Sequence, residues 1–541
     1  MRKSSAIKVT GAIVALSMVT VGFRASNPGT ILQIVPSPTS GAYTENFNPY
    51  STSSLPFTDG AIYQTLFYFN QVGPQVDPVL GTSYHWSNGN KTLRVDLRHG
   101  VHWSNGSAFT SKDVVFSFNL LKRNPALDTN SVWSQLASVS AKGTYQVVFQ
   151  FKVADVPFGW YVLGQTYIVP QTIWKHFANP KAETNVHPVG TGAYTLQRFT
   201  PQAYFFRANP KYWGGKPAVP TLEFPEYNSN SSAAVALASG KVGWAGLFVA
   251  NVQHIFAQKS PSTNHYWYPT TNLVMLFTNL KNPLLRQLPV RKAISLAINR
   301  PELYRIGEDG YESVASPTGL ALPADKTWID PHIPLSARKY AFNPQQAIRI
   351  LQSAGFHRNA SGTFVSRTGK PLSLVMNVNA GASDWAEDAS LVARNLKAIG
   401  IHVTLNPLTG SYYPDLLTGH YQMAIWWGGN PSGPSPYYLY QSMLAPTSSN
   451  NFEHWNNPVT TAALKAFATT RNVAKQHAAL DILQKAFVNQ LPSIPLLNGV
   501  AWNEYSTAKI VGWPSAKNPY AVPAPYAYPA DEIILMHLRV K

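Results

Sequence analysis

The chain of 541 residues contains no cysteine. Disulfide bonds, thiolate metal ligands and a cysteine nucleophile are therefore excluded. Anchoring through a lipid attached to a cysteine is excluded as well, so the protein is either free or held to a membrane in another way.

Acidic side chains are scarce. The chain has 43 Lys and Arg residues but only 25 Asp and Glu residues, which gives a net charge of +18, and just 13% of its residues are charged. The basic residues are scattered, without the run or stripe typical of a phosphate-binding surface, so no nucleic-acid partner is expected. We hypothesise that the protein works in an acidic habitat, at about pH 3, where surface carboxylates are largely protonated. Attraction to an anionic cell-wall polymer is the alternative explanation of the same charge.

Long apolar runs are missing except at the N-terminus. There a basic start precedes an apolar stretch at residues 9–23, which predicts a signal peptide over residues 1–25 with cleavage near Ala25. Phe23 is a poor match to the small residues that favour cleavage, so retention as a membrane anchor stays open. No other stretch approaches the roughly 18 apolar residues of a membrane span, so we expect the rest to be soluble and outside the cytoplasm.

Motifs of common hydrolases and nucleotide-binding enzymes are also missing. The chain has no G-x-S-x-G, no G-x-x-x-x-G-K-[ST] and no H-E-x-x-H. His99 and His102 are close in sequence, but their place in a predicted turn favours a solvated or packed role over a metal site. We therefore expect no enzyme activity, no metal and no cofactor. A glycoside hydrolase needs only a carboxylate pair across a cleft, so a secreted glycan or peptide hydrolase remains the alternative of another class.

The most informative stretch that is present covers residues 97–118, LRHGVHWSNGSAFTSKDVVFSF. Apolar residues alternate with polar ones at 95–97 as in a half-buried strand, and residues 104–106 supply turn chemistry. Thr110 and Asp113 then fit a capping box, and apolar residues follow at helical spacing. The stretch predicts a strand, a turn and a capped helix.

This stretch resembles the signature of the family five extracellular solute-binding proteins, the oligopeptide-binding class that serves ABC importers. Five further segments resemble the family in the same order, and the set spans most of the chain after about residue 40. They are PVGTGAYTLQRF at 188–199, NPKYWGGKPAV at 209–219, VRKAISLAINRPELY at 290–304, FNPQQAIRILQSAGF at 342–356 and LKAIGIHV at 396–403.

The resemblance implies an α/β protein with a two-lobed periplasmic-binding-protein-like fold, with mixed sheets and an extra inserted domain. Three domains are expected. Their residues are 30–75, 188–278 and 501–541 for a discontinuous domain I, 76–187 for the inserted domain II, and 279–500 for domain III, which forms the second lobe.

Several local elements follow from the residues alone. Apolar spacing predicts a helix over 290–298, and Asn343 followed by Pro344 predicts the start of another. A third helix is expected over 385–399, followed by a strand at 401–405. The apolar run near 62–69 also favours a helix.

The segment WWGGNPSGPSPYYLY at 426–440 is the best candidate for ligand contact. In the family that it resembles, tryptophan precedes a glycine-rich turn and an acid that pairs with a peptide's α-amino group. Here Asn430 stands where the acid is expected, and an amide cannot supply the same charge pairing. Neighbouring strand residues point to opposite sides, so at least one of the two tryptophans is expected to reach the cleft. The predicted ligand-binding residues of this segment are Trp426, Trp427, Gly428, Gly429, Asn430 and Tyr437.

Three earlier residues complete the predicted site. Trp133 lies where the resemblance implies an aromatic ring over the ligand, with packing as the alternative. Asn46 and Phe47 match a segment beside the cleft whose backbone could pair with an extended ligand, while turn chemistry before Pro49 is the alternative for Asn46.

Hinge motion is expected where the chain crosses between lobes, near 188–192 and 276–282. Gly190, Gly192 and Asn279 are the predicted hinge residues, because glycine accepts wide backbone excursions. For the two glycines, a simple tight turn is the alternative.

The predicted function is capture of an oligopeptide in the interlobe cleft and delivery to the permease subunits of an ABC importer, by a monomeric receptor. An oligosaccharide is the alternative ligand, because aromatic residues reach 12% of the chain. A metal complex is possible by family analogy, although nothing in the sequence favours it. A structural protein bound to the cell wall is a further alternative.

Overall fold

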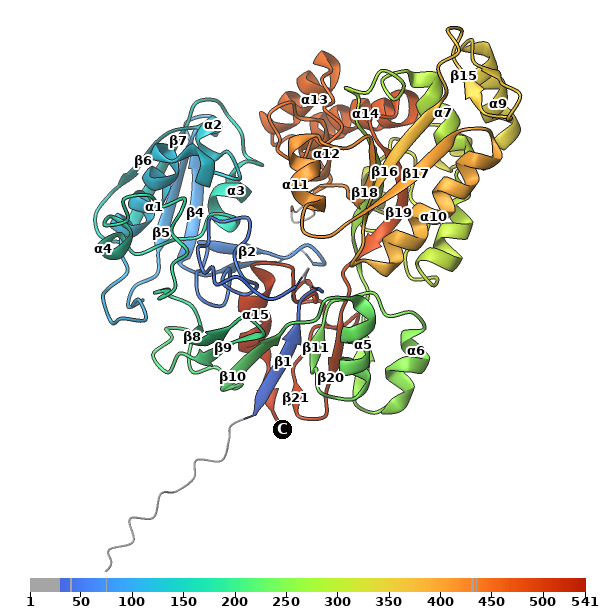
Figure 1. Cartoon of the computed structure of the whole chain (residues 1–541). Helices are drawn as coiled ribbons and strands as arrows, with labels where there is room; N and C mark the ends of the chain where they lie inside the picture. Colours follow the sequence, from blue (N-terminus) through green and yellow to red (C-terminus); the bar gives the residue numbers. More distant parts are fainter. Residues whose placement is uncertain (1–29, 39–40, 74, 430–432, 434) are drawn as a thin grey trace, which may run out of the picture.

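The computed structural model describes residues 30–38, 41–73, 75–429, 433 and 435–541. Its helices and strands are arranged in two lobes (Figure 1). The first lobe holds a seven-stranded and a four-stranded sheet, and the second lobe holds a five-stranded sheet. The predicted signal peptide lies outside the described residues. Among the described helices, none is long and apolar enough to cross a membrane.

The seven-stranded sheet is built from three separate parts of the chain. Its first strand β1 (Ile31–Val35) lies inside the sheet and runs parallel to both neighbours, with Ile31 opposite Thr221. In full the order is β12 (Asn264–Tyr266), β20 (Glu504–Ser506), β11 (Trp244–Ala245), β1, β10 (Thr221–Pro225), β9 (Ala203–Ala208) and β8 (Tyr194–Thr200). Helices and a small ribbon accompany it: α5 (Asn230–Ala238), α6 (Val252–Ile255), η2 (Ala257–Lys259), α15 (Ala530–His537), β21 (Ile510–Val511) and β22 (Arg539–Val540).

The four-stranded sheet is antiparallel and packs against α1 (Ser111–Arg123). The predicted capping box is confirmed, because the Thr110 side chain accepts from the helix and Asp113 accepts from the Thr110 backbone. The strand order is β4 (Gly81–Ser87), β5 (Thr92–Leu97), β7 (Gln146–Phe151) and β6 (Leu136–Ala141). Shorter elements of this part are β2 (Phe67–Phe69), β3 (Val76–Pro78), η1 (Pro125–Leu127), α2 (Val132–Gln135), α3 (Gly159–Gly164) and α4 (Gln171–Trp174).

The five-stranded sheet of the second lobe has helices on both faces (Figure 1). Its order is β17 (His402–Leu408), β16 (Ser373–Asn379), β18 (Met423–Trp427), β13 (Thr270–Thr278) and β19 (Ile494–Val500). The predicted helices and the strand after residue 400 are confirmed, and Asn343 caps its helix as expected. The other elements are α7 (Leu288–Ala297), α8 (Arg300–Glu302), η3 (Leu303–Gly307), η4 (Lys326–Trp328), η5 (Leu335–Arg338), α9 (Pro344–Ser353), β14 (His357–Arg358), β15 (Phe364–Val365), α10 (Ser383–Ala398), α11 (Tyr412–Thr418), α12 (Tyr437–Leu444), α13 (Pro458–Ala468) and α14 (Val473–Gln490).

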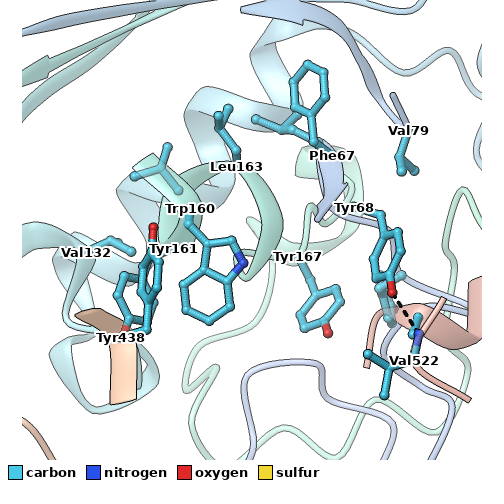
Figure 2. Close-up of a cluster of buried hydrophobic side chains, with 14 of the residues drawn as sticks. Phe67, Tyr68, Val79, Val132, Trp160, Tyr161, Leu163, Tyr167, Tyr438 and Val522 are labelled. Atoms are coloured by element: carbon cyan, nitrogen blue, oxygen red, sulfur yellow. Dashed lines mark hydrogen bonds between the residues drawn. The ribbon is translucent and has the colours of Figure 1, made fainter. Parts of the chain in front are cut away.

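The prediction of a helix near residues 62–69 is wrong. This segment forms turns and then β2, which pairs with β3. The run contains Tyr, Thr and Phe, which favour strands, and Phe67 and Tyr68 pack into the core beside α3 (Figure 2). Apolar runs of this length do not distinguish the two structures by periodicity.

Strand β13 bears on the domain division, which otherwise remains a prediction. The expected boundary at 278/279 assigns Thr270–Thr278 to domain I, but β13 pairs with β18 and β19 of the second lobe. The pairing moves the start of the second lobe to about Thr270. Two segments, 267–269 and 501–503, then connect the lobes and are hydrogen-bonded to each other: Trp267 N donates to Asn503 O at 3.1 Å, and Ala501 N donates to Pro269 O at 2.8 Å.

Candidate ligand-binding cleft

Two neighbouring cavities lie between the lobes, with volumes of about 480 and 460 Å³. Four aromatic residues border both cavities, so the two spaces adjoin at these side chains. These shared residues are Tyr413, Trp426, Trp427 and Tyr526. The first lobe contributes residues 49–52 and 127–130 to the larger cavity, and Asn228, Asn230 and residues 246–248 to the smaller one. The combined space has the size and apolar lining of a ligand site.

Trp426 and Trp427 lie at the end of β18, where the central strand of the second lobe reaches the cleft. Both side chains are half-buried, and both pack on Trp385 of α10 with ring centroids 5.1 and 5.2 Å away. Trp427 also lies directly over Gly499, where a Cβ atom would come within 2.3 Å of its ring. Both tryptophans border both cavities, so the structure brings the two together rather than sending one into the core.

The glycine turn after β18 holds this end of the strand in place. Gly428 donates its N–H to Leu273 O at 2.8 Å and is buried, outside the cavity lining. Gly429 borders the larger cavity with φ of +118°, which only glycine adopts readily, and its carbonyl accepts from Asn272 Nδ2 at 3.3 Å. Asn430 lies outside the described residues.

Tyr437 lies on α12 and borders a third interlobe space of about 430 Å³. Its ring is stacked on Phe467 at 4.6 Å, so most of the side chain is buried in the second lobe. This third space shares Thr129, Asn130 and Asn450 with the larger cavity. Tyr437 is therefore near the cleft but separate from the two tryptophans.

Phe47 lies elsewhere than expected. Its side chain is 0% exposed and packs against Phe199, Tyr204 and Phe206. Its N–H donates to Thr184 O and its carbonyl accepts from Asn185 Nδ2, so its backbone does not offer the strand pairing that was predicted.

Asn46 and Trp133 also lie outside the lining of these cavities. The Asn46 amide donates to Ser51 and Ser53 and accepts from the Asn48 N–H, which is the turn chemistry named as its alternative. The Trp133 indole donates to Phe118 O at 2.6 Å, and the Lys122 ammonium group lies over its ring. These contacts pack the Trp133 side chain against α1, in the inserted part of the first lobe.

The predicted hinge residues are held by specific contacts. Asn279 lies beyond β13 inside the second lobe, where its amide donates to Gly419 O and Tyr421 O, so it is not at a crossing between lobes. Gly190 and Gly192 run alongside residues 61–62, and a Cβ atom at Gly190 would lie 1.9 Å from Ile62 O. The close approach of two backbones explains both glycines without any hinge.

The lobes contact each other on both sides of the cleft. Tyr438 of α12 donates to Pro157 O at 2.8 Å and packs against Trp160, and Tyr161 donates to Gln441 at 2.9 Å (Figure 2). On the other side, Asn230 Nδ2 lies 3.4 Å from an oxygen of Asp384. The described structure therefore has its two lobes joined around the cavities.

Three carboxyl groups border the two cavities, and none is a simple exposed anion. Burial raises the pKa of Asp59 well above its usual range and that of Asp384 to about 6. Asp128 accepts from the backbone N–H groups of Val132 and Trp133 at 2.8 and 3.0 Å, and burial raises its pKa. These groups are suited to hydrogen bonding in acid rather than to ion pairing.

One cluster in the described chain has metal-ligand residue types, formed by Asp330, His332 and Asp481. It lies outside the lining of the interlobe cavities, and Asp330 is already paired with Lys485 at 3.1 Å. The cluster therefore adds nothing to the cleft.

Sequence reasoning missed most of the aromatic lining. Trp385, Tyr413, Trp502 and Tyr526 come from segments far apart in the chain, and they meet only in the folded structure. The aromatic content of 12% indicated that such rings exist but not where they gather.

Comparisons with known proteins agree with this geometry. A relative from Bacillus subtilis, the oligopeptide-binding protein AppA, is 26% identical over 326 residues, which is 58% of each chain. The peptide transport periplasmic protein SapA of Salmonella typhimurium is 22% identical over 494 residues, covering 85% of this chain and 86% of SapA.

Solved structures share the fold over nearly the whole chain. A periplasmic oligopeptide-binding protein of an ABC transporter from Thermotoga maritima, solved with bound mannohexaose, has a TM-score of 0.89 at 23% identity and covers 95% of this chain and 99% of its own. AppA from Bacillus subtilis in complex with a nonapeptide has a TM-score of 0.80 at 20% identity, over 95% and 99%. The profile described as bacterial extracellular solute-binding proteins, family 5 middle, matches residues 75–451. The chain therefore belongs to the family 5 bacterial extracellular solute-binding proteins.

Proposed function

We propose that this protein is the receptor of an ABC importer, which captures a short oligomer between its lobes and delivers it intact to the permease subunits in the membrane. The observation that carries the proposal is the pair of adjoining cavities between the two lobes, which contact each other on both sides of them. A binding protein of this kind needs no covalent chemistry, since ligand contacts made by both lobes are enough to favour the closed form.

Two ligand classes are candidates. The curated relatives are named for peptides, and one structural neighbour holds a nonapeptide. Another neighbour holds mannohexaose, and the aromatic lining of the present cleft favours a sugar as the second candidate. Either ligand is an oligomer long enough to extend through both cavities.

Ligand release requires the lobes to part. The paired segments 267–269 and 501–503 connect the seven-stranded sheet of the first lobe to the five-stranded sheet of the second lobe. We propose that these two segments absorb the hinge motion. The three-domain division, with the start of domain III moved from residue 279 to Thr270, and export directed by residues 1–25 belong to the same proposal.

A ligand present at about 100 times its dissociation constant should stabilise the folded protein by about 2.7 kcal/mol. Native mass spectrometry of protein purified without denaturation should first identify any retained ligand. Urea unfolding with and without that ligand then measures the gain. Recovery of a chemically altered ligand would contradict the receptor function and favour the hydrolase alternative, and the absence of any stabilising ligand would favour a structural role.

A further inference from the structure

Among the described residues, no cationic side chain lines the two adjoining cavities. The chain carries 43 Lys and Arg residues and 14 His residues, yet none of them is among the described residues that line these spaces. An anionic ligand group would have to leave water without a positive partner, which is costly in a partly closed site. A free peptide with both termini in the cleft would bring such a group, its α-carboxylate.

Apart from the three carboxyl groups of Asp59, Asp128 and Asp384, the polar side chains that line the two cavities are neutral. Amides and hydroxyls line both cavities, and an amide has donor and acceptor atoms that can bond to a ligand hydroxyl group. Some of these atoms are already bonded within the protein: Asn130 Nδ2 donates to Gln165 O, Thr166 Oγ1 to Tyr161 O and Asn230 Nδ2 to Asp384. In the larger cavity they include Gln71, Asn130, Gln165 and Thr166, and in the smaller one Asn228, Asn230, Asn379 and Thr409.

Half-buried aromatic rings lie where the two cavities meet. Trp426 packs between Trp385 and Tyr413, whose ring centroids are 5.1 and 5.4 Å from its own, so its orientation is fixed by neighbours on two sides. Trp427 and Tyr526 border the same junction. Rigid aromatic faces with polar groups around them bind flat molecules that have apolar faces and hydroxyl edges.

The segment that was predicted to pair with a peptide backbone is hydrogen-bonded within the protein. Phe47, predicted to lie beside an extended ligand, uses its N–H and its carbonyl within the protein. Backbone pairing at this position, which would favour a peptide, is therefore not offered.

We infer that the cleft binds an uncharged oligosaccharide of several sugar rings, which pack on the aromatic rings at the junction while their hydroxyl groups bond to the surrounding amides. The inference rests on the proposed receptor function and selects one of its two ligand classes. The combined cavities, about 480 and 460 Å³, give room for an oligomer rather than a single sugar.

Isothermal titration calorimetry of the full chain with matched hexamers tests the inference. The neutral probes are mannohexaose, cellohexaose and maltohexaose, the charged sugar is hexagalacturonate, and the peptides are hexa-alanine with free termini and with blocked termini. At least one neutral sugar should bind. The affinities of hexagalacturonate and of both peptides should be lower than its affinity by about a hundredfold or more.

Substitutions at the junction locate the binding. Trp427→Ala should lower the affinity for the neutral sugar by about tenfold or more. Trp427→Phe should retain most of that affinity, because an aromatic face remains. Trp328→Ala is the matched control, since Trp328 is a half-buried tryptophan stacked on His477 outside these two cavities. Circular dichroism establishes that each variant is folded.

The outcomes separate the inference from the proposed function. If either peptide binds more tightly than every neutral sugar, the inference that the ligand is an oligosaccharide is wrong. The proposed receptor function is not affected by that result. Equal affinity for neutral and charged sugars would also overturn it, because the missing cations would then have no effect. If no probe binds and native mass spectrometry finds no retained ligand, both the inference and the receptor function fail.

Discussion

The free energy of unfolding of this protein should be highest in acid and should fall as the pH rises from about 4 to about 8. Burial raises the pKa of several carboxyl groups far above the values of an unfolded chain. The pKa of Glu453 and that of Glu504 are raised to about 8, and that of Asp155 to about 7. In many proteins, salt bridges lower the pKa values of carboxylates, and the stability that these groups contribute is lost in acid. Buried acids with raised pKa values have the reverse effect, because their contribution is lost as the pH rises.

The direction follows from which state holds the proton. Between the two pKa values of such a group, the folded protein keeps the proton and the unfolded chain has lost it, so unfolding releases protons and becomes easier as the pH rises. Each group lowers the free energy of unfolding by about 1.4 kcal/mol per pH unit in that window. Its contribution is complete below about pH 4 and is lost as the pH passes the folded pKa.

A cluster of four buried acids adds to the effect. Glu308 and Glu312 lie close to Asp384 and Asp388 of α10, and burial raises the pKa values of all four groups. Repulsion by the other acids raises the pKa values of Glu308, Glu312 and Asp388 further. Ionisation of several of these groups at neutral pH would place like charges close together in a buried part of the second lobe, which reaches the smaller cavity at Asp384.

Urea unfolding at pH values from 3 to 8 measures the profile. Glu453→Gln and Glu504→Gln keep the shape of each side chain but remove its titration. Each substitution should therefore reduce the fall of the free energy of unfolding by about 1.4 kcal/mol per pH unit. Glu45→Gln, a partly exposed residue outside these sites, is the control and should leave the slope unchanged. A profile that peaks at neutral pH and falls below pH 4 would contradict the prediction and the acidic habitat together.

The same buried acids make the surface of the protein more basic than its composition alone indicates. Eleven of the 25 acidic residues are buried, although carboxylates are normally exposed. What remains on the surface is therefore depleted further in acids than the net charge of +18 indicates. The buried residues are Asp113, Asp155, Glu308, Glu312, Asp330, Asp384, Asp388, Glu453, Glu504, Asp531 and Glu532.

Elements governed by local contacts could be predicted from the sequence. The capping box of Thr110 and Asp113, the Asn343 cap and the helix that ends before Gly400 each depend on residues within one or two turns of one another. The resemblance in ordered segments supplied the two-lobed arrangement, which periodicity alone does not specify.

Features that depend on distant partners could not be predicted. Whether residues 62–69 form a helix or a strand is decided by β3 and α3, which pack on them. The side of the cleft to which β13 belongs is decided by its pairing with β18 and β19. Trp427 was found because of the resemblance, whereas Tyr526 was missed because no local pattern connects it with β18.

Substituting Gly190 by alanine should destabilise the folded protein by about 3 kcal/mol, with little effect on ligand affinity in the molecules that remain folded. The added Cβ atom would lie 1.9 Å from Ile62 O, and that carbonyl accepts from Gly192 N at 2.9 Å. Gly190 O in turn accepts from Ser104 N at 2.9 Å, so neither backbone is free to shift. Urea unfolding measures the loss of stability.

The control for stability is Gly381→Ala, because the nearest atom to a Cβ at Gly381 is Asn379 Oδ1, at 3.6 Å, and stability should change little. Gly381 borders the smaller cavity, so the ligand rates of Gly190→Ala are compared with those of the unmodified protein. The comparison separates two roles for Gly190. If Gly190 is a hinge, alanine should alter the rates of ligand association and release while stability stays close to that of the unmodified protein. If its role is the close approach of two backbones, stability falls and those rates are retained. The hydrogen bonds on both sides of the residue favour the second result, because a segment tied to two neighbouring strands of backbone has little freedom to act as a hinge.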